Sequence, residues 1–305
     1  MTWLHRYARL LVAATLLLVA AGGMVTSTNS GLSVPDWPTS YGYSMYSFPL
    51  SKMVGGIFYE HGHRLIASTV GFLTIGLVVF VWRVDPRAWM RRLSLVGLGA
   101  VILQGVLGGL TVLYMLPAPV SIGHAGLAQL FFCLTVSVAL FTSRSWLAPA
   151  VAPVDDATLR GRALGLTIAI YIQILLGATM RHIGAGLAIP DFPLSFGHVI
   201  PPMWSAQIAV HFAHRAFALV VAAWIVANAV YVWRRHRERR ELVGPATWLV
   251  GLVVVQATLG ALVVLTAKQP VLNTLHVATG AIVLGTSLVI TLRAFRVRFR
   301  GPARP

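Results

Sequence analysis

Residues 59–82 read YEHGHRLIASTVGFLTIGLVVFVW, and residues 209–233 read AVHFAHRAFALVVAAWIVANAVYVW. Each stretch opens on a polar element that contains a His-Arg pair, at positions 63–64 and 214–215. Each then continues as an apolar run of the length that an α-helix needs to cross a bilayer, about 20 residues. The two stretches therefore predict membrane-spanning helices that carry equivalent histidines near one end, in a chain that repeats itself.

The composition is that of an integral membrane protein. Of the 305 residues, 57% are hydrophobic and only 10% are charged, which is typical of this class. Eight apolar runs are long enough to span a bilayer, and we place them at 7–27, 59–82, 94–114, 121–142, 163–181, 209–233, 243–265 and 271–292. We expect the first run to be a retained span and not a signal peptide, because the repeat gives it a counterpart in the fifth run. The predicted fold is all-α.

The basic residues indicate how the chain is oriented. The net charge is +16, and Lys and Arg gather at both ends of the chain and in the alternate connecting segments 83–92, 144–162 and 234–240. This positive-inside pattern places both termini in the cytoplasm. The basic segments are expected to contact anionic lipid headgroups, so we expect membrane lipids and not nucleic acid as their partners.

An internal repeat divides the chain into two halves. GLSVPDWPTSYG at 31–42 recurs as GLAIPDFPLSFG at 186–197. Each half holds four spans, and because four is even, both halves enter the membrane in the same direction and should be related by an axis along the membrane normal. We expect two pseudo-symmetric four-helix bundles. The predicted parts are an N-terminal half at 1–142, a cytoplasmic linker at 143–162, and a C-terminal half with a basic tail at 163–305.

The repeated elements lie in two long outward-facing loops, at about 28–58 and 182–208. Proline lacks a backbone donor and restricts the residue before it, so the Pro-Asp-aromatic-Pro element cannot extend a helix. Its duplication favours an ordered loop that folds back as a lid over its bundle. The alternative is an exposed connector.

Four histidines occupy duplicated positions near the outer ends of alternate spans. His214 follows His63 by 151 residues, and His276 follows His124 by 152. In an up-and-down bundle these spans lie diagonally across the core, so each pair of imidazoles can hold an iron between them, and axial histidine ligation commonly holds haem. A single membrane histidine is more often a hydrogen-bonded core residue, but four at duplicated positions favour function. Zinc is less favoured, because the predicted spans of the second half contain no acidic or cysteine co-ligands.

Other duplicated polar residues accompany these histidines. Arg64 and Arg215 each follow a histidine, and beside a haem an arginine can pair with a propionate through charge-assisted hydrogen bonds. The alternative is an interfacial arginine that snorkels to headgroups. Gln104 and Gln256 are also duplicated, and we expect them to bridge helices by hydrogen bonds.

Glu60 breaks the symmetry of the two halves. It is the only acidic residue in any predicted span, and His211 occupies the equivalent position. Glu60 precedes His63 by three residues, so both side chains share a helix face, and a carboxylate near an iron can move protons. The alternative is a glutamate at the bilayer surface, bonded to backbone or arginine. His61 points away from His63, and we expect it on the surface.

The joint pattern resembles the haem A synthase family over essentially the whole chain. The resemblance is carried by two homologous four-span halves, Glu60-x-x-His63-Arg64, the loop from Gly31 to Pro38, His124, His214-Arg215 and His276. It implies a membrane oxidoreductase that converts haem O to haem A by oxidising a porphyrin methyl to a formyl through an alcohol. It implies that His63 and His124 bind the substrate haem O, that His214 and His276 hold a haem b cofactor, and that Glu60 is catalytic.

The resemblance also carries expectations about cofactors, partners and location. It implies dioxygen or water as the oxygen source with an external electron donor, and haem O synthase and cytochrome oxidase assembly factors as partners. It allows an oligomer. It implies the bacterial cytoplasmic membrane as the location, with the haem sites near its outer face.

One departure from the family concerns cysteine. Many bacterial members carry two cysteines in the first outer loop, whereas positions 34–41 hold none here and Cys133 is the only cysteine. No intramolecular disulfide can form, so a thiol relay at that loop is unsupported. The histidines alone fit a second function equally well, a quinol-linked di-haem b electron-transfer protein that oxidises no porphyrin. A haem carrier is a third alternative, which the nearly apolar spans disfavour.

Overall fold

The computed structural model describes residues 3–148 and 154–299, and in those ranges its regular structure is helical. Eight helices are long and apolar enough to cross a membrane. They are α1 (Trp3–Ser27), α2 (Gly56–Val84), α3 (Ala88–Leu113), α4 (Ala118–Phe141), α6 (Ala157–His182), α7 (Ala206–Arg235), α8 (Arg240–Leu265) and α9 (Pro270–Ala294). The short helix α5 (Arg144–Leu147) and the 3-10 turns η1 (Leu50–Lys52), η2 (Ala185–Leu187) and η3 (Arg296–Phe299) complete the order. The predicted all-α fold with eight spans is confirmed.

Several helices begin earlier than the apolar runs that predicted them. α6 starts at Ala157 and not at 163, because the side chain of Asp156 caps it by accepting a 2.9 Å hydrogen bond from the backbone N–H of Leu159. Hydropathy detects only the part of a helix that is suited to lipid and misses the polar turns that extend it. The end of the predicted linker is therefore helical, and its residues 149–153 lie outside the described part of the chain.

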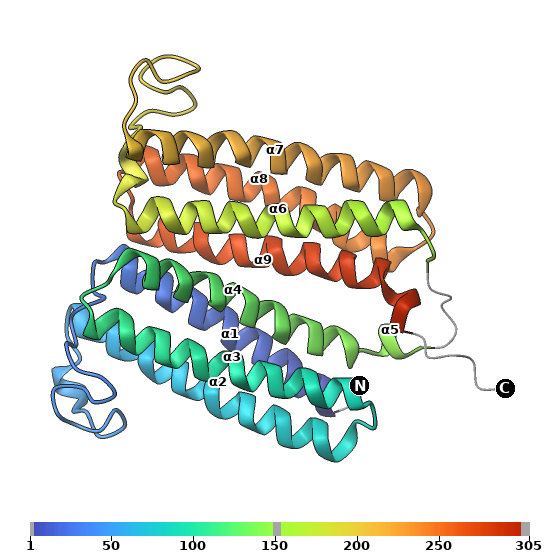
Figure 1. Cartoon of the computed structure of the whole chain (residues 1–305), viewed down its shortest axis with the longest axis horizontal. Helices are drawn as coiled ribbons and strands as arrows, with labels where there is room; N and C mark the ends of the chain where they lie inside the picture. The colour runs from blue at the N-terminus through green and yellow to red at the C-terminus, as the bar shows by residue number, and fades with distance from the viewer. Residues whose placement is uncertain (1–2, 149–153, 300–305) are drawn as a thin grey trace.

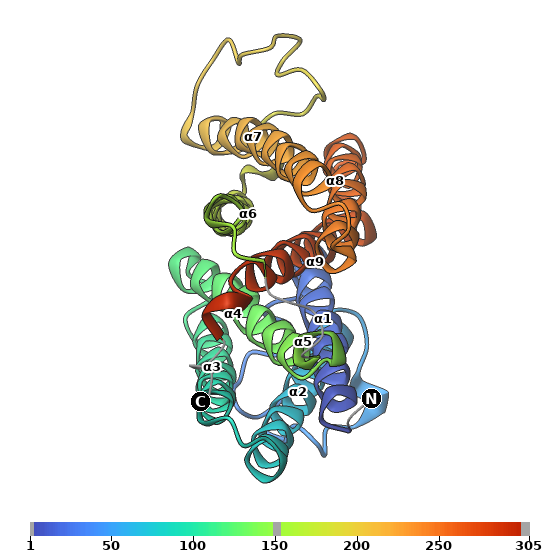
Figure 2. The same ribbon diagram turned by 90° about the vertical axis from the view of Figure 1, so that its right-hand side faces the viewer.

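The eight helices form two four-helix bundles that lie side by side (Figures 1 and 2). Around the first bundle α1, α2, α3 and α4 pack in ring order, and around the second α6, α7, α8 and α9 do the same. The bundles meet where α1 packs on α9 and where α4 packs on α6 and α9. Since α1 corresponds to α6 and α4 to α9 in the repeat, a two-fold axis along the helices would exchange the α1–α9 and α6–α4 contacts. This arrangement supports the predicted parallel repeat.

Both long loops lie at one end of the bundles, and the start of α1 and the end of α9 lie at the other (Figure 1). The densely packed apolar cores occupy the end without the long loops. One core includes Leu11, Val81 and Phe141, and the other includes Leu159 and Leu249. The ends of α2, α4, α7 and α9 that carry the four histidines are therefore outside the fully packed cores. The assignment of these ends to the two sides of the membrane stays a prediction.

The two long loops contain the same turn. Trp37–Pro38 and Phe192–Pro193 are both cis peptides, and the residues before each final glycine, Tyr41 and Phe196, both have positive φ. In the first loop, Asp36 accepts hydrogen bonds from the backbone N–H groups of Tyr41 (2.6 Å) and Gly42 (2.9 Å). In the second, Asp191 accepts the equivalent bonds from Phe196 (2.7 Å) and Gly197 (2.8 Å). The repeated sequence thus encodes a repeated Asp-centred turn.

Ionised Asp36 stabilises this turn. Partial burial opposes ionisation, but hydrogen bonds from the Gly42 backbone, the Thr39 hydroxyl and the Tyr41 backbone hold the pKa of Asp36 at about 2. The pKa of Asp191 is also lowered, by the backbone N–H groups of Gly197 and Phe196.

Candidate functional site

The four histidines lie at equivalent places in the two bundles. His63 and His124 lie on α2 and α4, and His214 and His276 lie on α7 and α9. Each of these helix pairs is diagonal in its ring, because the ring neighbours are the other helices of the bundle. The rings of His63 and His124 are close enough for their charges to interact, and so are those of His214 and His276. All four side chains are only partly buried.

A glycine on the preceding helix of the chain makes room for each imidazole. A Cβ atom built at Gly22 would lie 3.1 Å from the His63 ring, and one at Gly108 would lie 3.2 Å from His124. In the second bundle, the corresponding distances are 3.0 Å from Gly177 to His214 and 3.1 Å from Gly260 to His276. These distances are shorter than ordinary carbon contacts of about 3.5–4.0 Å. Only a residue without a side chain leaves each ring where it is.

Three of the imidazoles also have a glutamine neighbour. The Nε2 atom of Gln104 donates to the backbone carbonyl of His124 at 2.9 Å and lies 3.3 Å from its Nε2. Gln173 Nε2 donates to the carbonyl of His214 at 2.9 Å and lies 3.0 Å from its Nδ1.

The contact between Gln256 and His276 fixes the tautomer of the histidine. Nδ1 of His276 donates to the backbone carbonyl of Gln256 at 3.2 Å, and Gln256 Nε2 lies 3.4 Å from His276 Nε2. The Nε2 lone pair of His276 is thus available to a metal, with the other ring nitrogen oriented by the backbone, as is usual for metal-binding histidines. The sequence predicted Gln104 and Gln256 as helix bridges but gave no role to Gln173.

The glutamines leave unpaired polar atoms around the histidines. The Oε1 atoms of Gln104, Gln173 and Gln256 and the Nδ1 atom of His124 are buried, and within residues 3–148 and 154–299 they have no hydrogen-bond partner. Buried polar atoms are normally paired. Four unpaired atoms beside His124, His214 and His276, together with a glycine cradle at all four histidines, fit sites that are completed by a bound group.

Glu60 lies under the first long loop. It is only 4% exposed, and its carboxylate accepts a 2.8 Å hydrogen bond from the backbone N–H of Val34 and pairs with Arg64 at 2.7 Å. Arg64 also donates to the carbonyls of Val34 (2.7 Å), Asp36 (2.7 Å) and Thr39 (3.0 Å). Glu60 lies one turn from His63 on α2, as predicted. Its carboxylate is also paired with Arg64, which the sequence analysis gave as the alternative.

The second bundle repeats this network without the carboxylate. His211 replaces Glu60, and its Nε2 accepts a 3.0 Å hydrogen bond from Nε of Arg215. Arg215 also donates to the carbonyls of Ile189 (3.1 Å) and Leu194 (3.0 Å) in the second loop. Both arginines thus fasten a loop to a helix. Their predicted contact with haem propionates stays a prediction.

The expectation of a surface position for His61 is wrong. Its side chain is 1% exposed, its Nδ1 lies 3.0 Å from the Ser40 hydroxyl, and its ring packs against Phe48 with centroids 4.7 Å apart. His61 does point away from His63, but the folded-back loop covers the face of α2 on which it lies. Helix periodicity gives the direction of a side chain and cannot show what covers it.

The first loop also reaches α3. A Cβ atom at Gly109 would lie 2.5 Å from Cδ2 of Trp37, so the indole rests directly on the helix backbone. Together with the Arg64 contacts, this supports the predicted lid for the first bundle. The second loop is anchored through Arg215, but the loop extends past α7 (Figure 1), and Val199 and Trp204 in it are exposed.

Comparison with known proteins gives the chain a family. The family model COX15-CtaA, described as cytochrome oxidase assembly protein, matches residues 5–288. The chain belongs to the COX15-CtaA family. The match covers both bundles, from the first turn of α1 to the last turns of α9.

Curated relatives in the COX15-CtaA family carry a shared name. A protein of Symbiobacterium thermophilum is 34% identical over 82% of this chain and 82% of its own length. One of Caulobacter sp. (strain K31) is 34% identical over 97% and 95% of the two chains, and one of Geobacillus kaustophilus is 28% identical over 95% and 91%. All three are named "Heme A synthase".

One charged residue of this COX15-CtaA chain escaped the sequence analysis. Arg181, near the end of α6, donates to the Gly23 carbonyl (2.8 Å) and the Ser27 hydroxyl (3.1 Å) of α1, across the contact between the bundles. Among residues 3–148 and 154–299 no carboxylate pairs with it. Arg181 is not duplicated, because Thr26 occupies the equivalent position in the first half. A search for repeated polar residues therefore does not find it.

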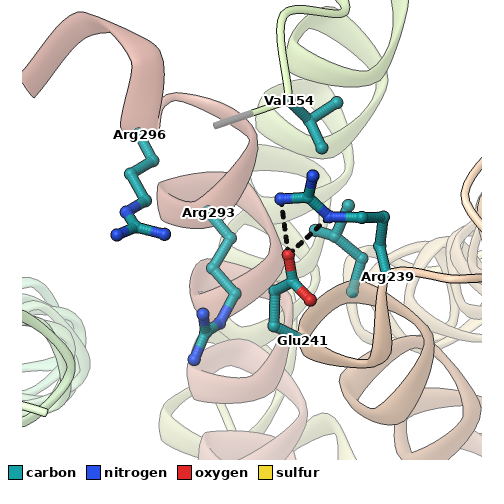
Figure 3. Close-up of a pocket in the computed structure, with 6 residues that line it drawn as sticks. Val154, Arg239, Glu241, Arg293 and Arg296 are labelled. Atoms are coloured by element: carbon teal, nitrogen blue, oxygen red, sulfur yellow. Dashed lines mark hydrogen bonds and ion pairs between the residues drawn. The ribbon is translucent and has the colours of Figure 1, made fainter. Parts of the chain in front are cut away.

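A second cluster of charges lies at the opposite end of the helices. Arg239, Arg293, Arg296 and Glu241 line a cavity of about 10 Å³ beside Val154 (Figure 3). Arg239 pairs with Glu241 at 2.7 Å, and Arg293 donates to the Ser145 hydroxyl at 2.9 Å. This volume accommodates about one water molecule, so the cluster is a basic helix end and does not accommodate a haem.

Proposed function

We propose that this protein is a haem A synthase, an integral membrane enzyme that oxidises a methyl group of haem O to a formyl group through an alcohol. The observation that carries the proposal is the pair of duplicated histidine sites with a buried carboxylate beside only one of them. The names of the COX15-CtaA relatives support the same activity.

The residues of each bundle fit a haem held from both sides. In the proposal, His63 and His124 of the N-terminal half bind the substrate haem O, and His214 and His276 of the C-terminal half hold a haem b cofactor. The glycine cradles and the unpaired atoms beside the rings support these assignments. When bound, such a haem supplies a redox-active iron, which none of the side chains can provide.

Glu60 is the proposed catalytic residue because it places an acid in the N-terminal bundle alone. Its two carboxylate oxygens have separate partners, Arg64 on Oε1 and the Val34 N–H on Oε2. A proton accepted at Oε1 would weaken the ion pair with Arg64, and the return of the proton to solvent would restore it. His211 takes the same position in the other bundle and supplies no carboxylate there, which suits a site that only carries electrons.

Arg64 and Arg215 have a double role in this proposal. Their Nη groups hold the loops that cover the bundle ends, which excludes water. Because the loops and the histidines lie at the same end, we propose that the same arginines also contact the haem propionates.

The remaining parts of the proposal concern the setting of the reaction. The oxygen comes from dioxygen or water. With dioxygen, an external donor supplies the electrons that reduce the second oxygen atom to water, and with water, the electrons taken from the methyl group pass to an external acceptor. The protein lies in a bacterial cytoplasmic membrane with both termini inside and the haem sites near the outer face. Haem O synthase and cytochrome oxidase assembly factors are the proposed partners, because the substrate must be supplied and the product consumed.

The test is product analysis of a matched pair of variants. Glu60→Gln keeps a hydrogen-bond acceptor for Val34 but removes the charge, so we expect normal haem content and loss of both haem A and the alcohol. The control Glu238→Gln changes an exposed glutamate at the opposite end and should keep full turnover. Haem is extracted after expression with haem O supply and identified by mass.

Two results would count against the proposal. Full turnover by Glu60→Gln would remove the proposed role of Glu60. A parent protein with two unmodified haems and no product would instead support quinol-linked electron transfer.

A further inference from the structure

The second long loop leaves its bundle sideways. It extends past α7 on the side away from the N-terminal bundle, beside the start of that helix (Figures 1 and 2). Because the spans cross the membrane, a direction at right angles to the helices is a direction within the plane of the membrane. The loop therefore lies at the edge of the protein, where the lipid bilayer begins.

The length of α7 gives the depth of this loop. α7 has 30 residues, which correspond to about 45 Å at about 1.5 Å per residue, whereas the hydrocarbon core of a bilayer is about 30 Å thick. Both ends of α7 therefore reach into the headgroup layers. The loop beside the start of α7 lies at the level of one of these layers.

The side of α7 that is not packed against protein faces lipid. In the described part of the chain, the main contacts of α7 are with α6, α8 and the 3-10 turn η2. Leu219 and Val226 are exposed, and their separation of seven residues places them on one face of the helix. An exposed apolar face on a membrane-spanning helix is a surface for lipid tails, and the loop extends past α7 in the direction of the surrounding lipid.

The second loop carries apolar side chains into this region. Val199 is 79% exposed, and Ile200, Met203 and Trp204 are each more than half exposed. No Asp, Glu, Lys or Arg occurs in residues 192–214. Exposed apolar patches mark sites of contact with protein or membrane. Because this patch lies next to the lipid-facing side of α7, lipid is the partner that its position favours.

The backbone and the tryptophan of the loop suit the headgroup layer. Pro201 and Pro202 have no N–H group, so this segment has fewer backbone donors for water to satisfy, but its other polar backbone groups exclude it from the hydrocarbon core. Trp204 packs edge-on against Phe212 of α7, with ring centroids 5.6 Å apart. Tryptophan is enriched at the interface between membrane and water.

We propose that residues 198–204 are a lipid anchor, which lies in the headgroup layer and inserts Val199, Ile200, Met203 and Trp204 toward the lipid tails. The anchor holds the start of α7 at a fixed depth in the membrane, because Trp204 links the loop to that helix. With the orientation proposed above, the anchor contacts the outer leaflet. The inference does not depend on the reaction that the protein catalyses.

The experiment measures the depth of the loop in a bilayer. Full-length Val199→Cys protein in a Cys133→Ser background is labelled with a nitrobenzoxadiazole fluorophore and placed in phosphatidylcholine nanodiscs that hold one chain each. Leu219→Cys in the middle of α7 is the reference for lipid, and Glu238→Cys, at an exposed position, is the reference for water. Quenching is compared for iodide in the water and for lipids with a doxyl group near the headgroup or near the chain end.

The expected result is distinct for each labelled position. The label at 199 should be quenched mainly by doxyl near the headgroup, the label at 219 mainly by doxyl near the chain end, and the label at 238 mainly by iodide. Adding Ile200→Glu places a charge in the anchor, which is unfavourable within the membrane, so we expect a loss of lipid quenching at 199. The matched variant Ile200→Leu should keep it.

Three results would overturn the proposal. The first is quenching by iodide that is as strong at 199 as at 238. The second is equal lipid quenching at 199 in the Ile200→Glu and Ile200→Leu chains, because the apolar side chains would then not set the depth of the loop. The third is protection from iodide that occurs only in membranes dense enough for chains to meet, which would assign the loop to a contact with a second copy.

Discussion

Gly109→Ala should lift the first loop from its bundle. The added Cβ would lie 2.5 Å from Cδ2, 2.6 Å from Cε2 and 2.9 Å from Cε3 of Trp37. Carbon atoms normally pack at about 3.5–4.0 Å, so the indole must move by about 1 Å. Overpacking of this kind costs about 1–3 kcal/mol, which corresponds to an increase of about 5–150-fold in the open population of the loop.

A matched variant controls for the second effect of the substitution, which is the higher helix propensity of alanine. Alanine is favoured over glycine in a helix by about 1 kcal/mol, and Gly105→Ala on the same helix brings this gain with no heavy atom of a neighbour within 4 Å of its Cβ. The difference between the two variants therefore measures the clash with Trp37 alone.

The opening is measured by thiol labelling. Val34 is 0% exposed and lies in the same loop, so a Val34→Cys thiol in a Cys133→Ser background reacts only when the loop opens. We expect Gly109→Ala to react faster than Gly105→Ala by the factor above. In Trp37→Ala chains, Gly109→Ala should have no further effect. Equal labelling of the two glycine variants would refute the packing of Trp37 on α3.

Three further predictions test the two bundles. Arg64→Ala leaves the buried carboxylate of Glu60 without its cation and should lower the stability to thermal unfolding by about 3–5 kcal/mol. Arg215→Ala loses only bonds to neutral groups and should lower this stability by about 1–3 kcal/mol. Equal losses in the two variants would contradict the difference between the two networks. Gly177→Ala should push the His214 ring, 3.0 Å from the new Cβ, and reduce the haem content of the purified protein, while Gly161→Ala on the same helix, with no neighbour within 4 Å, should not. Because the folded pKa of Asp36 is about 2 and its ordinary value is 3.8, its contribution to the turn is present above about pH 4 and is lost as the pH falls toward 2. The Val34→Cys labelling rate, divided at each pH by the rate of a free thiol because only the thiolate reacts, should increase over that range, and Asp36→Asn should abolish this increase.

The duplicated features were predictable from the sequence. Apolar runs gave the eight spans, and duplication distinguished His63 and His124 from isolated membrane histidines. The loops were predictable as ordered elements because the Pro-Asp-aromatic-Pro element recurs, and the structure shows the reason in the bonds of Asp36 and Asp191.

The features that break the repeat were harder to predict. Gln173 escaped notice because its counterpart is Leu18, although the spacing of four residues between glutamine and glycine recurs at Gln104 and Gln256. The burial of His61 depends on how the first loop folds over α2. Helix periodicity carries no information about the position of that loop. The pairing of Glu60 with Arg64 was one of two alternatives. The sequence could not decide between them, because both His63 and Arg64 lie within one helical turn of Glu60.

Arg181 gives the contact between the bundles an electrical role. Its guanidinium bonds to α1 from α6, close enough to His276 for their charges to interact, and no carboxylate neutralises it within residues 3–148 and 154–299. A positive charge in a medium of low dielectric acts over a long distance. It therefore stabilises negative charge added to either bundle, and in the proposed function both haems would lie within the potential of the same cation. The positive potential of Arg181 thus acts on both halves, although Arg181 itself is present in only one of them.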